Sequence, residues 1–95
     1  MSETETIPWR TEDHLKTAED IAAYLEAAFV DGDPRLIAHA LGVAARSKGM
    51  SEIARRAGLG RQSLYKALSS EGKPEFGTVI KVLHALGLKL KLAVS

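Results

Sequence analysis

Residues 50–70 read MSEIARRAGLGRQSLYKALSS, and this stretch has the pattern of two short helices joined by a turn of only a few residues. Ala54 is small where the two helices would approach most closely, and Gly58 stands where the turn needs a left-handed backbone, which glycine adopts without steric cost. Four apolar residues would pack the pair onto the preceding helix: Ile53, Leu59, Leu64 and Leu68. The pattern predicts a helix-turn-helix with its core at residues 50–70. The alternative is an ordinary pair of antiparallel helices with a solvated basic face.

The polar residues that follow Gly60 are of the types that read DNA. Arginine and glutamine make bidentate hydrogen bonds to guanine and adenine edges in the major groove, and recognition helices use their first residues for this contact. We expect base contacts from Arg61, Gln62, Ser63 and Lys66. Cations and hydroxyl groups on flanking segments are expected to hold DNA phosphates: Arg46, Lys48, Ser51, Arg55, Arg56 and Tyr65. For Tyr65, a place in the apolar core is an equal alternative.

Composition narrows the class of protein. The chain has 95 residues, which suits one domain, and it has no cysteine, which excludes disulfides and thiolate zinc sites and suits a reducing compartment. Its three histidines are scattered, and no nucleophile–base pair or phosphate-binding glycine loop stands out, so we expect no metal, no cofactor and no enzyme activity. The N-terminus is acidic without an apolar stretch, and no segment is long enough to span a bilayer. The expected location is the cytoplasm.

Charge is distributed unevenly along the chain. Residues 1–33 contain two basic and nine acidic residues, a net charge of −7, whereas residues 34–95 contain eleven basic and three acidic residues, a net charge of +8. An acidic head on a basic body suggests two different partners. The alternative is a chance drift of surface charge.

Capping residues and apolar periodicity predict an all-α, phage-repressor-like domain at residues 9–95 behind a flexible N-terminus at residues 1–8. The expected helices begin after Thr17, at Pro34, at Ser51, at Arg61 and at Phe76, and they end near Asp31, Lys48, Ala57, Ser69 and Ala85. Residues 88–92 alternate leucine with lysine, which favours a short C-terminal β-strand at residues 88–94. A single strand needs a partner, either the N-terminal segment or the same strand of a second copy in a two-fold dimer.

Four segments of the sequence resemble a known family. They read AAYLEAAF before GDP, ARSKGMSEIARRAGL, RQSLYKALS and PEFGTVIKVLHALGLKL, and the resemblance as a whole runs from about Trp9 to Val94. In these segments the chain resembles the antidote (antitoxin) proteins of bacterial addiction modules, HigA-like members of the phage-repressor-like (Xre-type) helix-turn-helix group. Family members often have serine where Gly60 stands and asparagine where Lys73 stands, and these departures bear on operator choice.

The resemblance implies a protein that neutralises a small basic toxin of the RelE/ParE-like class and represses its own operon. It also implies that Arg61, Gln62, Ser63 and Lys66 occupy the DNA-reading positions. From the C-terminal strand, we expect the DNA-bound form to be a homodimer. The alternative function is that of a stand-alone phage-type transcriptional regulator without a toxin. A basic chain of about one hundred residues encoded beside this gene would distinguish the two.

Overall fold

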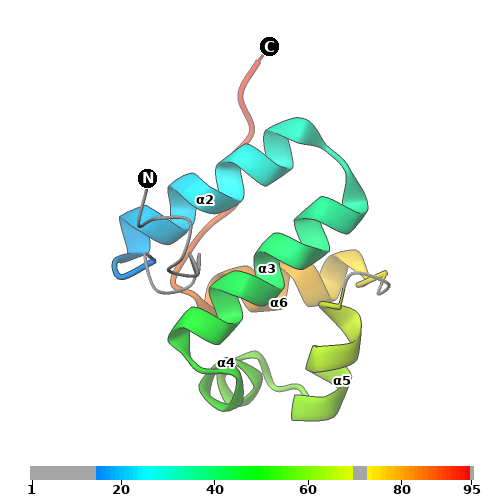
Figure 1. Ribbon diagram of the computed structural model, residues 1–95. Helices are drawn as coiled ribbons and strands as arrows, with labels where there is room; N and C mark the ends of the chain where they lie inside the picture. The colour runs from blue at the N-terminus through cyan, green and yellow to red at the C-terminus, as the bar shows by residue number, and fades with distance from the viewer. Residues whose placement is uncertain (1–14, 70–72, 95) are drawn as a thin grey trace, which may run out of the picture.

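A computed structural model describes residues 15–69 and 73–94 and folds them into five helices (Figure 1). The helices are α2 (Ala18–Asp31), α3 (Pro34–Lys48), α4 (Met50–Ala57), α5 (Arg61–Ala67) and α6 (Phe76–Ala85). The all-α expectation is therefore confirmed for the described part of the chain. The predicted boundary at residues 8 and 9 lies outside it. Among these helices, none is both long and apolar enough to cross a lipid bilayer.

Local capping residues set both ends of α2 and the start of α3. The Thr17 hydroxyl accepts a hydrogen bond from the Asp20 backbone N–H at 3.0 Å, and the Asp20 carboxylate accepts from the Lys16 and Thr17 backbone N–H groups at 3.1 and 3.2 Å. These backbone hydrogen bonds, first the one from Lys16, hold the pKa of the Asp20 carboxyl below its ordinary value. Gly32 takes the left-handed conformation with φ of 87° and ends α2, and the Asp33 side chain then caps α3. Both helices begin and end where the sequence predicts.

The core gathers around α3, whose inward side consists mainly of small residues. Every helix contributes at least one side chain that is essentially removed from solvent: Ile21, Leu41, Ile53, Leu64 and Val82. Gly42 in α3 lies so close to the chain after α5 that a Cβ atom built there would be 2.9 Å from the Leu68 carbonyl oxygen. The small residues of α3 therefore allow the following helices to pack directly against its backbone.

The predicted C-terminal strand is wrong. Gly87, with φ of 81°, closes α6, and the Leu88 backbone N–H donates to the Leu83 carbonyl oxygen at 2.9 Å. Beyond Leu88 the tail is irregular, and it makes no backbone hydrogen bond to any described residue. A strand exists only beside another extended segment that shares its hydrogen bonds, and the described residues of this chain supply none. We use "tail" for residues 88–94 below.

Candidate nucleic-acid interface

The structure confirms the two helices and the turn that residues 50–70 predict, as α4, a tight turn and α5. The Gly58 N–H donates to the Arg55 carbonyl oxygen at 3.2 Å, and the Leu59 N–H donates to the Ala54 carbonyl oxygen at 2.9 Å. Gly58 has φ of 71°, so this turn needs the left-handed conformation that the sequence assigned to it. In Figure 1, α4 is seen nearly end-on while α5 is seen from the side, so the two helices cross steeply. α5 ends at Ala67, two residues before the predicted end.

α5 turns its apolar side inward and its polar side to solvent. Leu64 is completely buried, and Leu68, which caps the helix, is 3% exposed. All four residues expected to read bases are exposed: Arg61, Gln62, Ser63 and Lys66. The described residues therefore leave free the helix face that carries groups able to pair with base edges.

Tyr65 lies on the exposed side of α5 and not in the core. Its side chain is 42% exposed, which contradicts the core alternative. The Arg61 guanidinium carbon lies 5.6 Å from the centre of the Tyr65 ring, within the range of a cation–π contact. Because the two residues are four positions apart on one helix, the ring limits the directions that the arginine can take. The contact partly fixes the first base-reading candidate before any ligand arrives.

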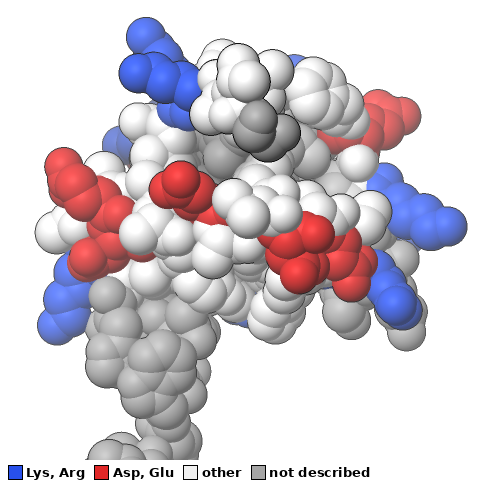
Figure 2. All heavy atoms as spheres, turned by 90° about the horizontal axis from the view of Figure 1, so that it is seen from above, with Lys and Arg blue, Asp and Glu red and all other residues white. Residues whose placement is uncertain are grey.

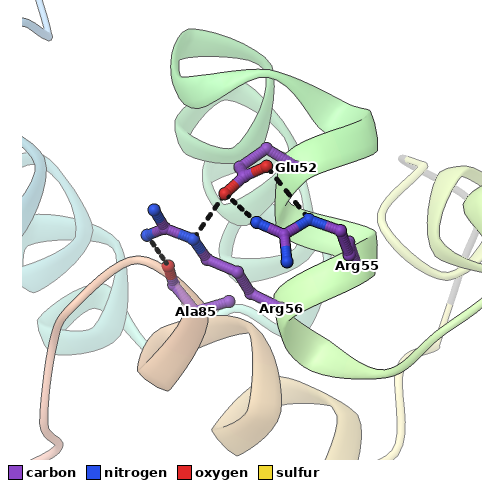
Figure 3. A network of polar contacts seen from close by, with 4 residues as sticks. All are labelled: Glu52, Arg55, Arg56 and Ala85. Atoms are coloured by element: carbon purple, nitrogen blue, oxygen red, sulfur yellow. Dashed lines mark hydrogen bonds and ion pairs between the residues drawn. The ribbon is translucent and has the colours of Figure 1, made fainter.

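Arg55 and Arg56, two candidates for phosphate contacts, share one carboxylate on α4 (Figure 3). Glu52 Oε2 accepts from Arg55 Nη2 at 2.6 Å and from Arg56 Nε at 2.7 Å, and Arg56 Nη1 donates to the Ala85 carbonyl oxygen at 3.5 Å. The Arg55 hydrogen bond, followed by that of Arg56, holds the pKa of the Glu52 carboxyl below its ordinary value. Arg56 thus links α4 to the end of α6, whereas the side-chain hydrogen bonds of Arg55 to described residues all go to Glu52. The sequence interpretation missed Glu52, although its spacing to both arginines is typical of helical ion pairs.

The remaining phosphate candidates border the same two helices. Arg46 and Lys48 are exposed in the last turn of α3, and Ser51 is exposed in the first turn of α4. Arg46 Nη1 would lie 3.3 Å from a Cβ at Gly42, which places it beside Leu68 at the end of α5. Residues 46–66 contain six cations and one carboxylate, a net charge of +5. The polar face of α5 therefore lies within the most basic stretch of the chain, as binding to a phosphate backbone requires.

Comparison with known proteins identifies the family. A family model described as "probable addiction module antidote protein" matches residues 5–94, nearly the whole chain. The chain belongs to this family. An uncharacterized protein of Haemophilus influenzae is 46% identical over 83 residues, which cover 87% of this chain and 86% of that protein. No solved structure matches the chain. The resemblance to addiction-module antidotes is confirmed, and an antidote has a toxin as its partner.

Proposed function

We propose that this antidote is a cytoplasmic binding protein, not an enzyme, that binds operator DNA as a HigA-like, Xre-type homodimer and represses its own operon. One observation carries the DNA-binding part: the exposed polar face of α5 has arginine and glutamine in its first turn and a buried leucine behind them. A side chain at that position can reach base edges in the major groove while the leucine anchors the helix. Two such helices in a two-fold dimer would read half-sites about 34–36 Å apart.

The test is a titration of the DNA upstream of the gene, at two salt concentrations, with the parent and with Arg61→Ala. Loss of a bidentate base contact costs about 1–3 kcal/mol, so operator affinity should fall roughly 5- to 150-fold and discrimination at one base pair should relax. Arg35→Ala is the matched control, because Arg35 is an exposed arginine in the first turn of α3 and lies outside the α4–α5 unit. Equal affinity of the Arg61 variant and the parent for operator and scrambled DNA would contradict the assignment.

The second part of the proposal is that the acidic head binds a basic toxin of the RelE/ParE-like class. α2 carries four acidic residues and no lysine or arginine, and all four are exposed. Asp31 stands in the last turn of α2, where a carboxylate faces the negative end of the helix dipole and destabilises the helix. A residue that is unfavourable for its own helix is more easily explained by a partner of opposite charge.

Charge removal on α2 tests the toxin part separately. The double variant Glu19→Gln/Asp31→Asn should fold as the parent does, because neither carboxylate makes a hydrogen bond or ion pair with another described residue. Its affinity for the product of the neighbouring gene should fall about tenfold or more, as charge complementarity is lost. Glu75→Gln, an exposed carboxylate just before α6, is the control. Undiminished toxin affinity of the double variant would contradict the placement on α2.

A further inference from the structure

Large apolar side chains are exposed mainly at one end of the molecule. Of the seven that the described residues expose, five lie on α2, at the start of α6 and on the tail: Val30, Phe76, Leu90, Leu92 and Val94. Phe76 is 72% exposed and Leu92 is 93% exposed. Figure 1 shows the tail passing α2 at the end of the molecule away from α4 and α5. Apolar side chains gathered in this way on a small domain mark an interaction surface more often than a free surface.

The α2–tail groove, as we name it, lies among these side chains. It has a volume of about 690 Å³ and lies between α2, α6 and the tail, with Val30, Phe76 and Leu90 among its lining residues. Its two walls have opposite charge. The α2 wall contributes Glu26, and the tail wall contributes Lys89 and Lys91. Figure 2 looks onto this end of the molecule and shows acidic and uncharged side chains across the middle of the face, with basic side chains toward its edges.

We propose that the occupant of the α2–tail groove is a second copy of this chain. A two-fold interface uses the same surface on both subunits, so that surface must be complementary to itself. A groove with one acidic and one basic wall meets this condition, because rotation by 180° brings the acidic wall of each copy opposite the basic wall of the other. A uniformly basic or acidic partner would match one wall and be repelled by the other. The interface consists of side-chain packing and ion pairs and needs no β-strand.

This inference rests on the homodimer of the proposed function and assigns it a surface. Among the described residues that line the groove, none belongs to α4 or α5, so the face proposed to read DNA stays uncovered. Glu19 and Asp31, the residues proposed to attract the toxin, do not line the groove either. Dimer formation, base contact and toxin binding are thus assigned to different surfaces, so a substitution in one surface leaves the side chains of the other two in place.

The first test compares two leucines of equal exposure. Leu90 in the groove and Leu36 on α3 are both 41% exposed, so Leu90→Asp and Leu36→Asp introduce the same charge at equally exposed sites. Sedimentation equilibrium of the full chain should show a dimer for the parent and for Leu36→Asp. For Leu90→Asp the dimer dissociation constant should rise about 10- to 100-fold, because a two-fold interface contains each leucine twice. Circular dichroism confirms that both variants remain folded.

A charge exchange provides the second test and does not depend on packing. Glu26→Lys and Lys91→Glu should each weaken the dimer several-fold at low salt, because each places like charges across the interface. The double variant Glu26→Lys/Lys91→Glu should recover most of the parent's affinity for itself. If Glu26 and Lys91 did not face each other across the interface, the double variant would not regain the dimer affinity that each single variant loses.

Three results would overturn the proposal: a parent that stays monomeric at high micromolar concentration, equal dimerisation of the Leu90 and Leu36 variants, or no rescue by the charge exchange. Operator titration distinguishes this failure from that of the proposed function. A monomeric parent that still discriminates operator from scrambled DNA refutes the groove dimer and the homodimer of the proposed function, but it leaves base reading by α5 in place. A dimeric parent that binds no DNA refutes only the DNA-binding function.

Discussion

Replacing Gly42 with alanine tests how closely α3 packs against the end of α5. A Cβ at this position would lie 2.9 Å from the Leu68 carbonyl oxygen, 3.3 Å from Arg46 Nη1 and 3.6 Å from Leu68 Cβ. The arginine can move away, but the carbonyl belongs to the backbone that caps α5. Since carbon and oxygen atoms do not approach so closely without strain, α3 and the end of α5 must separate by several tenths of an ångström.

The expected magnitude follows from two opposing effects. Alanine in the middle of a helix is more stable than glycine by about 1 kcal/mol. Overpacking a buried contact costs about 1–3 kcal/mol, and a rigid backbone partner places this contact toward the upper end. Gly42→Ala should therefore destabilise the protein by about 1–2 kcal/mol net, which lowers Tm by roughly 4–8 °C for each kcal/mol in a domain of this size. Operator affinity should fall as well, because the displaced helix is α5.

Gly77→Ala is the matched control. Gly77 also lies in a helix, α6, but a Cβ there meets nothing within 4 Å, and its φ is not positive. The same substitution should therefore leave stability unchanged or raise it by up to about 1 kcal/mol. Urea and thermal denaturation of the three proteins measure the difference. If Gly42→Ala proves as stable as Gly77→Ala, the close approach of α3 to Leu68 is refuted.

Three further predictions concern polar groups. Glu52→Gln frees two arginines, so affinity for scrambled DNA should rise and the plot of log K against log salt should steepen by about one; anisotropy titrations measure this, with Glu75→Gln as a control that should change neither. Tyr65 is expected from the sequence to hold a phosphate, but its contact with the Arg61 guanidinium favours a role in base reading. Tyr65→Ala should therefore weaken operator binding about two- to fivefold and leave scrambled DNA unaffected, whereas an equal loss on both DNAs would support the phosphate contact. Asp20→Asn should lower Tm at neutral pH. Because the folded-state pKa of Asp20 is lowered, its stabilising contribution is present above the ordinary value of 3.8 and disappears as pH falls through the lowered pKa, so the variant and parent should converge in acid.

Helix boundaries could be predicted because they depend on neighbouring residues. The Thr17 hydroxyl reaches an N–H three residues ahead, and Gly32 and Gly58 take positive φ wherever the chain leaves a helix in this way. Short-range rules of this kind also placed the turn before α5 and the exposed side of that helix. The same rules would have found the Glu52 cluster, since its partners lie three and four positions along a predicted helix.

The tail shows where the sequence pattern stops being informative. Alternation of leucine with lysine indicates which side chains would share a face if the backbone were extended. It does not indicate whether another backbone lies beside it, and hydrogen bonds to such a neighbour are what make a strand. The closeness of Gly42 to Leu68 was not predicted for a related reason, because it depends on how two distant segments meet. Patterns within one element predict faces, whereas contacts between elements require the structure.

The sequence of α5, the helix proposed to read DNA, is not sufficient to hold that helix in its observed position. α5 has seven residues, no side-chain cap at its N-terminus and no acidic residue in its first turn, and isolated helices of this length are not stable in water. Its position is imposed by Leu64 and Leu68, which are buried in the common core, and by α3, whose glycine allows the end of α5 to come close. A substitution that loosens the core around α3 should therefore displace the proposed base-reading side chains of α5, even though it does not contact them. For the same reason, we expect substitutions at buried positions of α3 to lower operator affinity.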